Sequence, residues 1–393
     1  MLTQIRHAFD RATETEKRLL ALAVSLLVIW IGFHLLTGGL FLTPRNFFNL
    51  AVQSSTVGVL SVGMVLVIAT KNIDLSVGSV LGFVGITVAF LQIEVFPADA
   101  AWNWPLTVLL GLALGTGIGL WQGFLVAYVG IPSFVVTLAG LLIFRGAAFE
   151  ATQGQTLSPF QDAYRFFGGG TSGSLGEAAS WAIAALAIAG IAAFSLRRSR
   201  AHPAERAALW SMAAFAALFT VFSIWMFNAY DRPRSEIGHG LPSPILILAV
   251  MAGLAILFVR HAPFGRHVFA VGQDIESARL VGVPTRLVVL KVFAVMGALC
   301  AVGAIITTSR LNAGTTNLGT LLELNVIAAA VIGGASLDGG RGSILGGILG
   351  AFVIQSLDTG LVLLGVSSSM RQILIGFVLI AAVWFDKVAA RRG

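Results

Sequence analysis

Charged residues are scarce in this sequence, and cysteine is almost missing. Only 11% of the 393 residues are Asp, Glu, Lys or Arg, whereas 57% are hydrophobic and the mean hydropathy is +0.90. This is too little polar surface to cover a water-soluble globule. The single cysteine, Cys300, excludes an intrachain disulfide framework and a cysteine-ligated metal cluster. We therefore expect lipid to be the main solvent of the folded chain.

The motifs of common enzyme classes are missing as well. No Gly-Lys dipeptide occurs, which excludes a Walker A phosphate loop, so any ATP hydrolysis would have to come from another chain. There is no His-Glu-x-x-His, Gly-x-Ser-x-Gly or Cys-x-x-Cys sequence, and the six histidines are scattered. We predict no catalytic residue, no metal site and no cofactor in this chain, which leaves a polytopic membrane enzyme as the weakest interpretation.

Long apolar runs are what the sequence has in abundance. Most reach the roughly 17–25 residues that a helix needs to cross a bilayer. Their continuity disfavours a β-barrel, and the 45 glycines suit close helix packing in lipid. We predict an all-α, polytopic transmembrane helical bundle of about 10–12 spans. The predicted segments are 19–36, 49–70, 75–95, 105–128, 132–149, 178–196, 207–229, 243–259, 288–308, a short one at 321–335, 344–364 and 372–385.

Basic residues concentrate in alternate loops. If the N-terminus is inside, 17 Lys and Arg residues fall in inner loops and 6 in outer loops. The positive-inside rule then places both termini in the cytoplasm, and the net charge of +7 needs no nucleic-acid partner. The first segment could also be a secretory signal peptide, but its length and the lack of a small-x-small cleavage site disfavour this alternative.

Three features interrupt the pattern of spans. The longest inner loop is 260–287, an additional hairpin at 178–229 is joined by a basic turn, and residues 153–176, rich in Gly, Ser and Thr, form an outer loop that we expect to be flexible. The predicted domains are a cytoplasmic N-terminal tail at 1–18, a transmembrane domain at 19–386 and a cytoplasmic C-terminal tail at 387–393.

The inner loop 260–287 is amphipathic. Asp274 to Val281 is predicted to form a short helix, with Asp274 as its N-cap and Gly282 as a left-handed stop. Such a helix could dock a soluble partner or lie on the lipid surface, and the pattern alone favours neither alternative.

Four stretches resemble, in the same order, the ribose/xylose branch of sugar ABC permeases. They are 63–79, with Ile73-Asp74-Leu75-Ser76-Val77-Gly78-Ser79, then 132–146, 264–283 and 331–346. The third resembles the cytoplasmic coupling loop, which in that family fits a cleft on the ATPase subunit. The resemblance assigns ATPase coupling to Gly265, Arg266, Gly272, Glu276, Ala278, Arg279 and Gly282.

The resemblance implies a complete importer in the bacterial inner membrane. Its parts would be a homodimer of permeases, cytoplasmic ABC ATPase subunits that hold ATP and Mg, and a periplasmic sugar-binding protein, with transport by alternating access. The length and the central hairpin are more similar to xylose-type than to ribose-type members. A permease for ribose, galactose or another sugar is the alternative. An ion-coupled secondary transporter is less favoured because it needs carboxylates at the membrane midplane.

Several residues have a local interpretation beside a functional one. Asp74 is predicted to cap the helix that follows it, and Gly78 and Gly82 to form a packing seam. The glycine run 333–347 could line the pathway or pack tightly, and Asp358 could face the pore or a packing partner. A neutral sugar calls for hydrogen-bonding groups, so the candidate pathway or gate residues are Asn49, Gln53, Ser54, Ser55, Gln122, Asn325, Gly333, Gly334 and Asp358.

Overall fold

The computed structural model describes residues 14–201, 206–233 and 237–390. Within these ranges every regular element is a helix, and ten helices are long and apolar enough to cross a membrane. The predicted segments 321–335 and 372–385 correspond to shorter apolar helices, Leu322–Ile332 and Ser368–Ala381. These observations confirm the all-α polytopic bundle.

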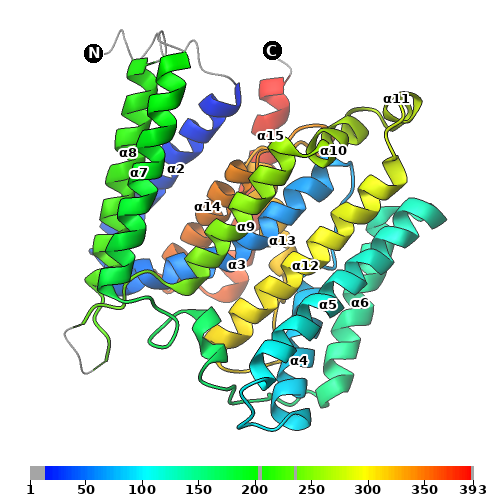
Figure 1. Ribbon diagram of the computed structural model, residues 1–393, viewed down its shortest axis with the longest axis horizontal. Helices are drawn as coiled ribbons and strands as arrows, with labels where there is room; N and C mark the ends of the chain where they lie inside the picture. The colour runs from blue at the N-terminus through cyan, green and yellow to red at the C-terminus, as the bar shows by residue number, and fades with distance from the viewer. Residues whose placement is uncertain (1–13, 202–205, 234–236, 391–393) are drawn as a thin grey trace.

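The helices follow one another along the chain as Figure 1 shows. They are α2 (Glu14–Leu36), α3 (Pro44–Ala69), α4 (Val77–Phe90) with the π-helical turn η1 (Leu91–Val95), α5 (Asn103–Phe124) with the π-helical turn η2 (Leu125–Val129), α6 (Ser133–Thr152), the 3₁₀ turn η3 (Tyr164–Gly168), α7 (Glu177–Ala201), α8 (Arg206–Asn228), α9 (Ser243–His261), α10 (Pro263–Gln273), α11 (Ile275–Leu280), α12 (Thr285–Leu311), α13 (Leu322–Ile332), α14 (Ile344–Leu363) and α15 (Ser368–Ala390).

Helix α3 is the central helix of the bundle. In its most apolar window 89% of the residues are buried, and α12, α13 and α14 all pack against it. Its start is set by Pro44 in the first turn, where a missing N–H costs nothing. Helix α12 in turn packs along α5, where a Cβ on Gly115 or Gly297 would overlap the opposite backbone. Glycine therefore lets these two helices touch backbone to backbone.

The additional hairpin is formed by α7 and α8, which lie beside α2 at one side of the bundle (Figure 1). Aromatic rings of α8 fix it in place: Phe222 and Phe227 lie 5.7 and 5.4 Å from the ring of Phe47 on α3. The ring of Phe219 lies 6.1 Å from that of Trp30 on α2. The hairpin is thus packed onto the bundle through ring contacts, which suit an apolar interface.

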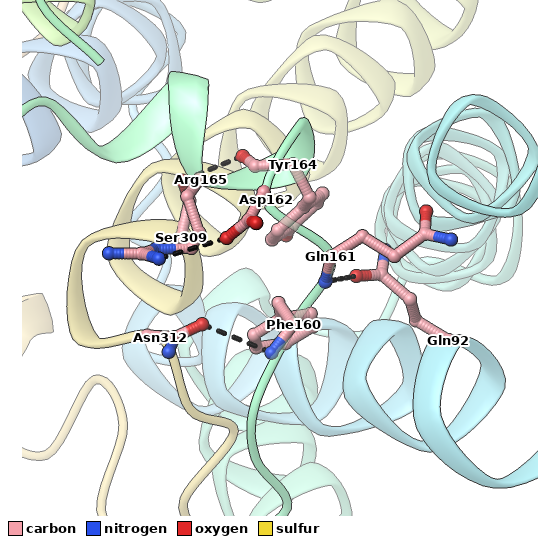
Figure 2. Close-up of polar contacts among 8 residues, drawn as sticks. All are labelled: Gln92, Phe160, Gln161, Asp162, Tyr164, Arg165, Ser309 and Asn312. Atoms are coloured by element: carbon pink, nitrogen blue, oxygen red, sulfur yellow. Dashed lines mark hydrogen bonds and ion pairs between the residues drawn. The ribbon is translucent and has the colours of Figure 1, made fainter. Parts of the chain in front are cut away.

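The two ends of the bundle differ. Helix α2 begins, α15 ends and α10 and α11 lie at one end, while residues 153–176 lie at the other (Figure 1). These residues, which we name the outer cap, are not the flexible loop expected from their composition. The backbone N–H of Gln161 donates to Gln92 Oε1 at 3.1 Å, and that of Phe160 donates to Asn312 Oδ1 at 3.0 Å (Figure 2).

Helix α12 supplies further anchors for the outer cap. Ser309 Oγ donates to the carbonyl oxygen of Tyr164 at 2.8 Å, and the Tyr164 hydroxyl lies 2.7 Å from Thr308 Oγ1. The Tyr164 ring itself is fully buried. The small polar residues that suggested flexibility allow tight turns, and the anchoring partners are supplied by helices that are distant in the sequence.

Candidate functional site

The predicted short helix in the inner loop is present as α11. The Asp274 carboxylate caps it by accepting hydrogen bonds from the backbone N–H groups of Glu276 at 3.0 Å and Ser277 at 3.3 Å. The Ser277 hydroxyl bonds the same carboxylate at 2.7 Å. These bonds, that from the Ser277 side chain first, lower the pKa of Asp274. Gly282 follows the helix with φ +84°, as predicted for a left-handed stop.

The first half of the inner loop is also helical, as α10, which was not predicted as a separate helix. Val268 and Val271 are buried, and two glycines bring α10 onto the bundle. A Cβ on Gly265 would overlap the carbonyl oxygen of Val259, and one on Gly272 would overlap that of Ala69. Gly265 and Gly272, two of the three glycines assigned to coupling, are therefore points of backbone contact.

A set of contacts at the end of α10, which we name the inner clamp, ties this helix to the bundle. Lys71 Nζ donates to the carbonyl oxygen of Gln273 at 3.0 Å. The N–H of Gly340, in the turn between α13 and α14, donates to the carbonyl oxygen of Ala69 at 2.9 Å. The end of α10, the end of α3 and the turn before α14 thus meet at one point. A displacement of α10 would be passed directly to α3 and α14.

The tip of α11 is apolar and exposed. Leu280 and Val281 expose 87% and 80% of their surface, beside the exposed Arg279, which lies 3.9 Å from Glu276. Helix α11 lies at the periphery of this end of the bundle, next to α10 (Figure 1). Exposed apolar residues rimmed by charge are typical of a protein-docking surface. Leu280 and Val281 were not among the residues assigned to coupling, although two large apolar residues directly before a helix-ending glycine in a polar loop were a usable signal.

The remaining residues assigned to coupling divide between surface and interior. Arg266 is exposed on α10, and Ala278 is buried on the bundle side of α11. The structure therefore brings all seven residues into one element formed by α10 and α11. Four of them, Gly265, Gly272, Ala278 and Gly282, shape this element, and the three charged ones face outward.

A second polar region lies inside the bundle, along residues 312–321, which we name the re-entrant segment. It leaves the end of α12 and follows α4, with Gly314 against Ala89 and the carbonyl oxygen of Gly319 against Gly78. The stretch of α4 from Gly78 to Ala89 is about 16 Å long, roughly half of a bilayer core. Non-helical backbone at such depth is tolerated only where protein encloses it or water fills a cavity.

Arg145 of α6 holds the re-entrant segment in place. Its Nη1 donates to the carbonyl oxygens of Leu318 at 2.8 Å and Thr316 at 3.2 Å. Glu323, in the first turn of α13, is only 6% exposed, and its Oε2 finds no hydrogen-bond partner among the described residues. Gly78 and Gly82 pack against the segment, which confirms their role as a packing seam.

A buried hydrogen-bond network lies just before α4. Asp74 Oδ1 accepts from the backbone N–H of Ser76 at 2.8 Å and from its hydroxyl at 2.6 Å, and Gln122 Nε2 donates to the same hydroxyl at 2.8 Å. Ser76, and not Asp74, is the N-cap residue of α4. The predicted capping role of Asp74 is therefore wrong: its carboxylate closes a turn over Ser76, because the helix begins two residues later than expected.

The candidate pathway residues on α3 and α13 have different surroundings. Gln355 of α14 donates from Nε2 to Gln53 Oε1 at 3.0 Å; Gln355 is buried and Gln53 is half-buried. Ser55 bonds back to the carbonyl oxygen of Ala51, and the buried Ser54 hydroxyl has no partner in the described part of the chain. The other two, Asn49 and Asn325, are half-buried.

Three further candidates lie near α14 and have packing partners. A Cβ on Gly333 would overlap the backbone of Gly346, and Gly334, with φ +101°, packs against the Arg18 side chain. Asp358 forms a 2.6 Å ion pair with Arg371 of α15. For these residues the geometry favours the packing alternative that the sequence left open.

Two cavities are prominent in the structure. One, of about 350 Å³, lies between α2, α3, α7, α8 and α9, and the other, of about 740 Å³, lies between α9 and α12. None of the nine candidate pathway residues lines either of them. These two cavities are therefore not formed by the residues that the sequence assigned to the pathway.

The comparison with known proteins agrees with this architecture. The family model described as "Branched-chain amino acid transport system / permease component" matches residues 46–383. The xylose transport system permease protein of Haemophilus influenzae is 40% identical over 371 residues, which cover 92% of this chain and 94% of the relative. The Escherichia coli K12 counterpart is 36% identical over 94% of this chain and 91% of its own length.

More distant sugar permeases match as well. The ribose import permease protein of Escherichia coli K12 is 31% identical over 88% of this chain and 87% of its own length. No solved structure gives a significant match. These relatives confirm the resemblance to the ribose/xylose branch, and the ten apolar helices agree with a multi-pass inner-membrane protein. The chain belongs to the family of branched-chain amino acid transport system permease components and is, within it, a transport subunit of the sugar permease branch.

Proposed function

We propose that this chain is the membrane-spanning permease subunit of an ATP-driven importer of D-xylose. The observation that supports the substrate most directly is the similarity to two xylose permeases, 36–40% identical over 92–94% of the chain, compared with 31% over 88% for the ribose permease. Few charged groups lie within the spans, which fits a neutral solute, because an ionic substrate would need a compensating charge.

In this proposal a cytoplasmic ABC ATPase binds the tip of α11. The apolar pair Leu280 and Val281 would enter a cleft of the ATPase, and Arg279 would pair with an acidic group at its rim. ATP and Mg are bound by the ATPase, since this sequence has no Walker A loop. Closure of the ATPase subunits would pull on α10, and the inner clamp would pass the movement to α3 and α14.

The sugar pathway is proposed to form between two copies of the chain. Gln53 and Asn325 are half-buried and Gln355 is buried, and polar groups on membrane helices require a polar neighbour or water. A partner copy would enclose them, giving weak hydrogen bonds that a neutral sugar can make and break. A periplasmic sugar-binding protein would deliver xylose at the end of the bundle that carries the outer cap.

Uptake in reconstituted vesicles tests the proposal. The chain is assembled with its ATPase and binding protein, and entry of labelled xylose, ribose, arabinose and galactose is measured with ATP present and the ion gradient collapsed. We expect ATP-dependent uptake of xylose above the other three sugars. Entry of ribose or galactose without xylose would refute the substrate, whereas uptake that needs an ion gradient but not ATP would refute the importer class.

A further inference from the structure

The larger cavity is an apolar groove open at the side of the bundle, and its floor is formed by Val62 and Leu66 of α3. Helices α9 and α12 form its two walls, and α10 closes one end, as the arrangement of these helices in Figure 1 shows. Its volume is about 740 Å³, within the roughly 300–1,000 Å³ usual for small-molecule sites. The groove is therefore large enough to hold a flexible hydrocarbon chain.

The groove has the depth of one membrane leaflet. On α12 its lining runs from Leu287, near the α10 end, past Lys291 to Leu299, and twelve residues of helix span about 18 Å. Half of a hydrocarbon core of about 30 Å is about 15 Å. With the topology predicted from the basic loops, this is the inner leaflet, where anionic lipids collect.

One positive charge stands at the mouth of the groove. Lys291 is exposed, lies among apolar neighbours and makes no hydrogen bond or ion pair with any described residue. Of the other lining residues only His267 can carry charge, and no Asp or Glu lines the groove. A lysine near the end of a membrane helix extends its ammonium group to the interface, and no Asp or Glu that lines the groove would compete there with an anionic headgroup.

We propose that this groove binds an anionic phospholipid of the inner leaflet, with one acyl chain between α9 and α12 and the phosphate held by Lys291 and His267. A sugar does not fit this site, because almost no polar group lines it. The combination of one cation with a leaflet-deep apolar channel matches a phospholipid and not a free anion, which would gain nothing from the channel. The groove is separate from the α11 tip at Leu280 and Val281 and from the Gln53–Gln355 pair.

Thermal unfolding of the purified full-length protein in detergent tests the site. Cys300 is the only thiol and is buried, so its reaction with a fluorogenic thiol dye reports unfolding. The probes are palmitoyl-oleoyl phosphatidylglycerol, the matching phosphatidylcholine and glycerol 3-phosphate. We expect phosphatidylglycerol alone to raise the Tm, by about 5 °C near saturation, because a ligand that binds only the folded state stabilises it.

Three variants separate a built site from general attraction to the surface. Lys291→Met should weaken phosphatidylglycerol binding about tenfold, as loss of a charged hydrogen bond predicts. Ala294→Trp, or Ala255→Phe if the first variant does not fold, should block the groove and abolish the shift without removing a charge. Arg286→Met removes an exposed charge from the same helix outside the groove and should keep the full shift.

Defined results would overturn the inference. Equal loss in Lys291→Met and Arg286→Met would indicate diffuse surface attraction. An equal shift with phosphatidylcholine or with glycerol 3-phosphate would remove the anionic lipid as the ligand. Disulfide formation between chains carrying Leu254→Cys or Leu287→Cys, in a Cys300→Ala background, would show that a second copy covers the groove instead.

Discussion

Leu280 and Val281 are the most specific testable feature at the end of the molecule that carries α11. We expect Leu280→Asp to weaken ATPase binding at least tenfold, because burial of a leucine side chain contributes about 1.5–3 kcal/mol. Co-purification with the ATPase and sugar-stimulated ATP hydrolysis measure the loss. Leu280→Met keeps the apolar surface and should bind normally. Full activity of Leu280→Asp would place the docking site elsewhere.

Substitutions of Gly282 change the backbone at the end of α11 without changing its exposed side chains. A Cβ at this position would meet no atom within 4 Å, so only the backbone conformation, with φ +84°, opposes a side chain. Gly282→Val should cost about 1–2 kcal/mol there, while Gly282→Asn should cost less because asparagine adopts left-handed conformations. We expect normal membrane insertion of both, with sugar uptake lost only in the valine variant. Loss of uptake in both would mean that the glycine is needed for another reason.

Asp274 makes the order of α11 dependent on pH. Hydrogen bonds from Ser277 and Glu276 lower its pKa below the usual 3.8, so the cap is fully present above pH 3.8 and is lost as the pH falls through the lowered value. Amide hydrogen exchange over residues 276–280 should therefore be unchanged from pH 7 to pH 5, after correction for intrinsic rates. Asp274→Ala should lose protection at pH 7, and Asp274→Asn should keep most of it. Equal protection in all three proteins would argue against the cap.

Among the elements, the re-entrant segment is held by the Arg145 side chain and by two backbone hydrogen bonds between Gly314 and Leu157. Arg145→Met would leave the carbonyl oxygens of Leu318 and Thr316 without their donor, at a cost of about 1–3 kcal/mol. The expected result is a lower Tm and reduced uptake, whereas Arg145→Lys should retain part of both. The matched control is Arg165→Ala, which removes an exposed arginine paired with Asp162 and should change little. A Tm loss equal to that of the control would exclude this anchoring role.

An element could be predicted when the residues that specify it lie close together in the sequence. Spans such as α3 and α12 were located because continuous hydrophobic runs specify membrane helices. The α11 helix was found because its cap and stop residues are local. The re-entrant segment and the outer cap were missed, because Arg145, Gln92 and Asn312 reach them from distant parts of the sequence.

The candidate site was predictable to a similar extent. The residues assigned to coupling are close together in the sequence, and six of the seven lie on α10 and α11, with Gly282 directly after α11; their role in coupling stays a prediction. The pathway candidates were chosen for side-chain type alone. Side-chain type does not distinguish Gln53, which bonds to Gln355, from Asp358, which forms an ion pair with Arg371. In addition, a pathway that forms between two copies of the chain would not produce a recognisable set of pocket residues in the sequence of one copy.

For the molecule as a whole, the orientation in the membrane is the main prediction of the charge pattern. In a Cys300→Ala background, Leu280→Cys and Asp162→Cys place highly exposed thiols at opposite ends of the bundle. An impermeant thiol reagent should label Asp162→Cys in spheroplasts and Leu280→Cys only after the membrane is opened. The reverse pattern would invert the topology. A thiol at Ser235, another outer-loop position, lies outside the described residues.

The enclosure of α3 also has a consequence for how the molecule is made. With a mean hydropathy of 1.9 this helix can enter lipid by itself, yet 89% of the same window ends up surrounded by protein. Helix α12, the first of the three covering helices α12, α13 and α14, begins 216 residues after α3 ends. At about 5–20 residues per second, ribosomal synthesis of that stretch takes on the order of 10–40 s. During biogenesis, lipid must therefore occupy the position that α12, α13 and α14 later take, and it has to be expelled when they arrive.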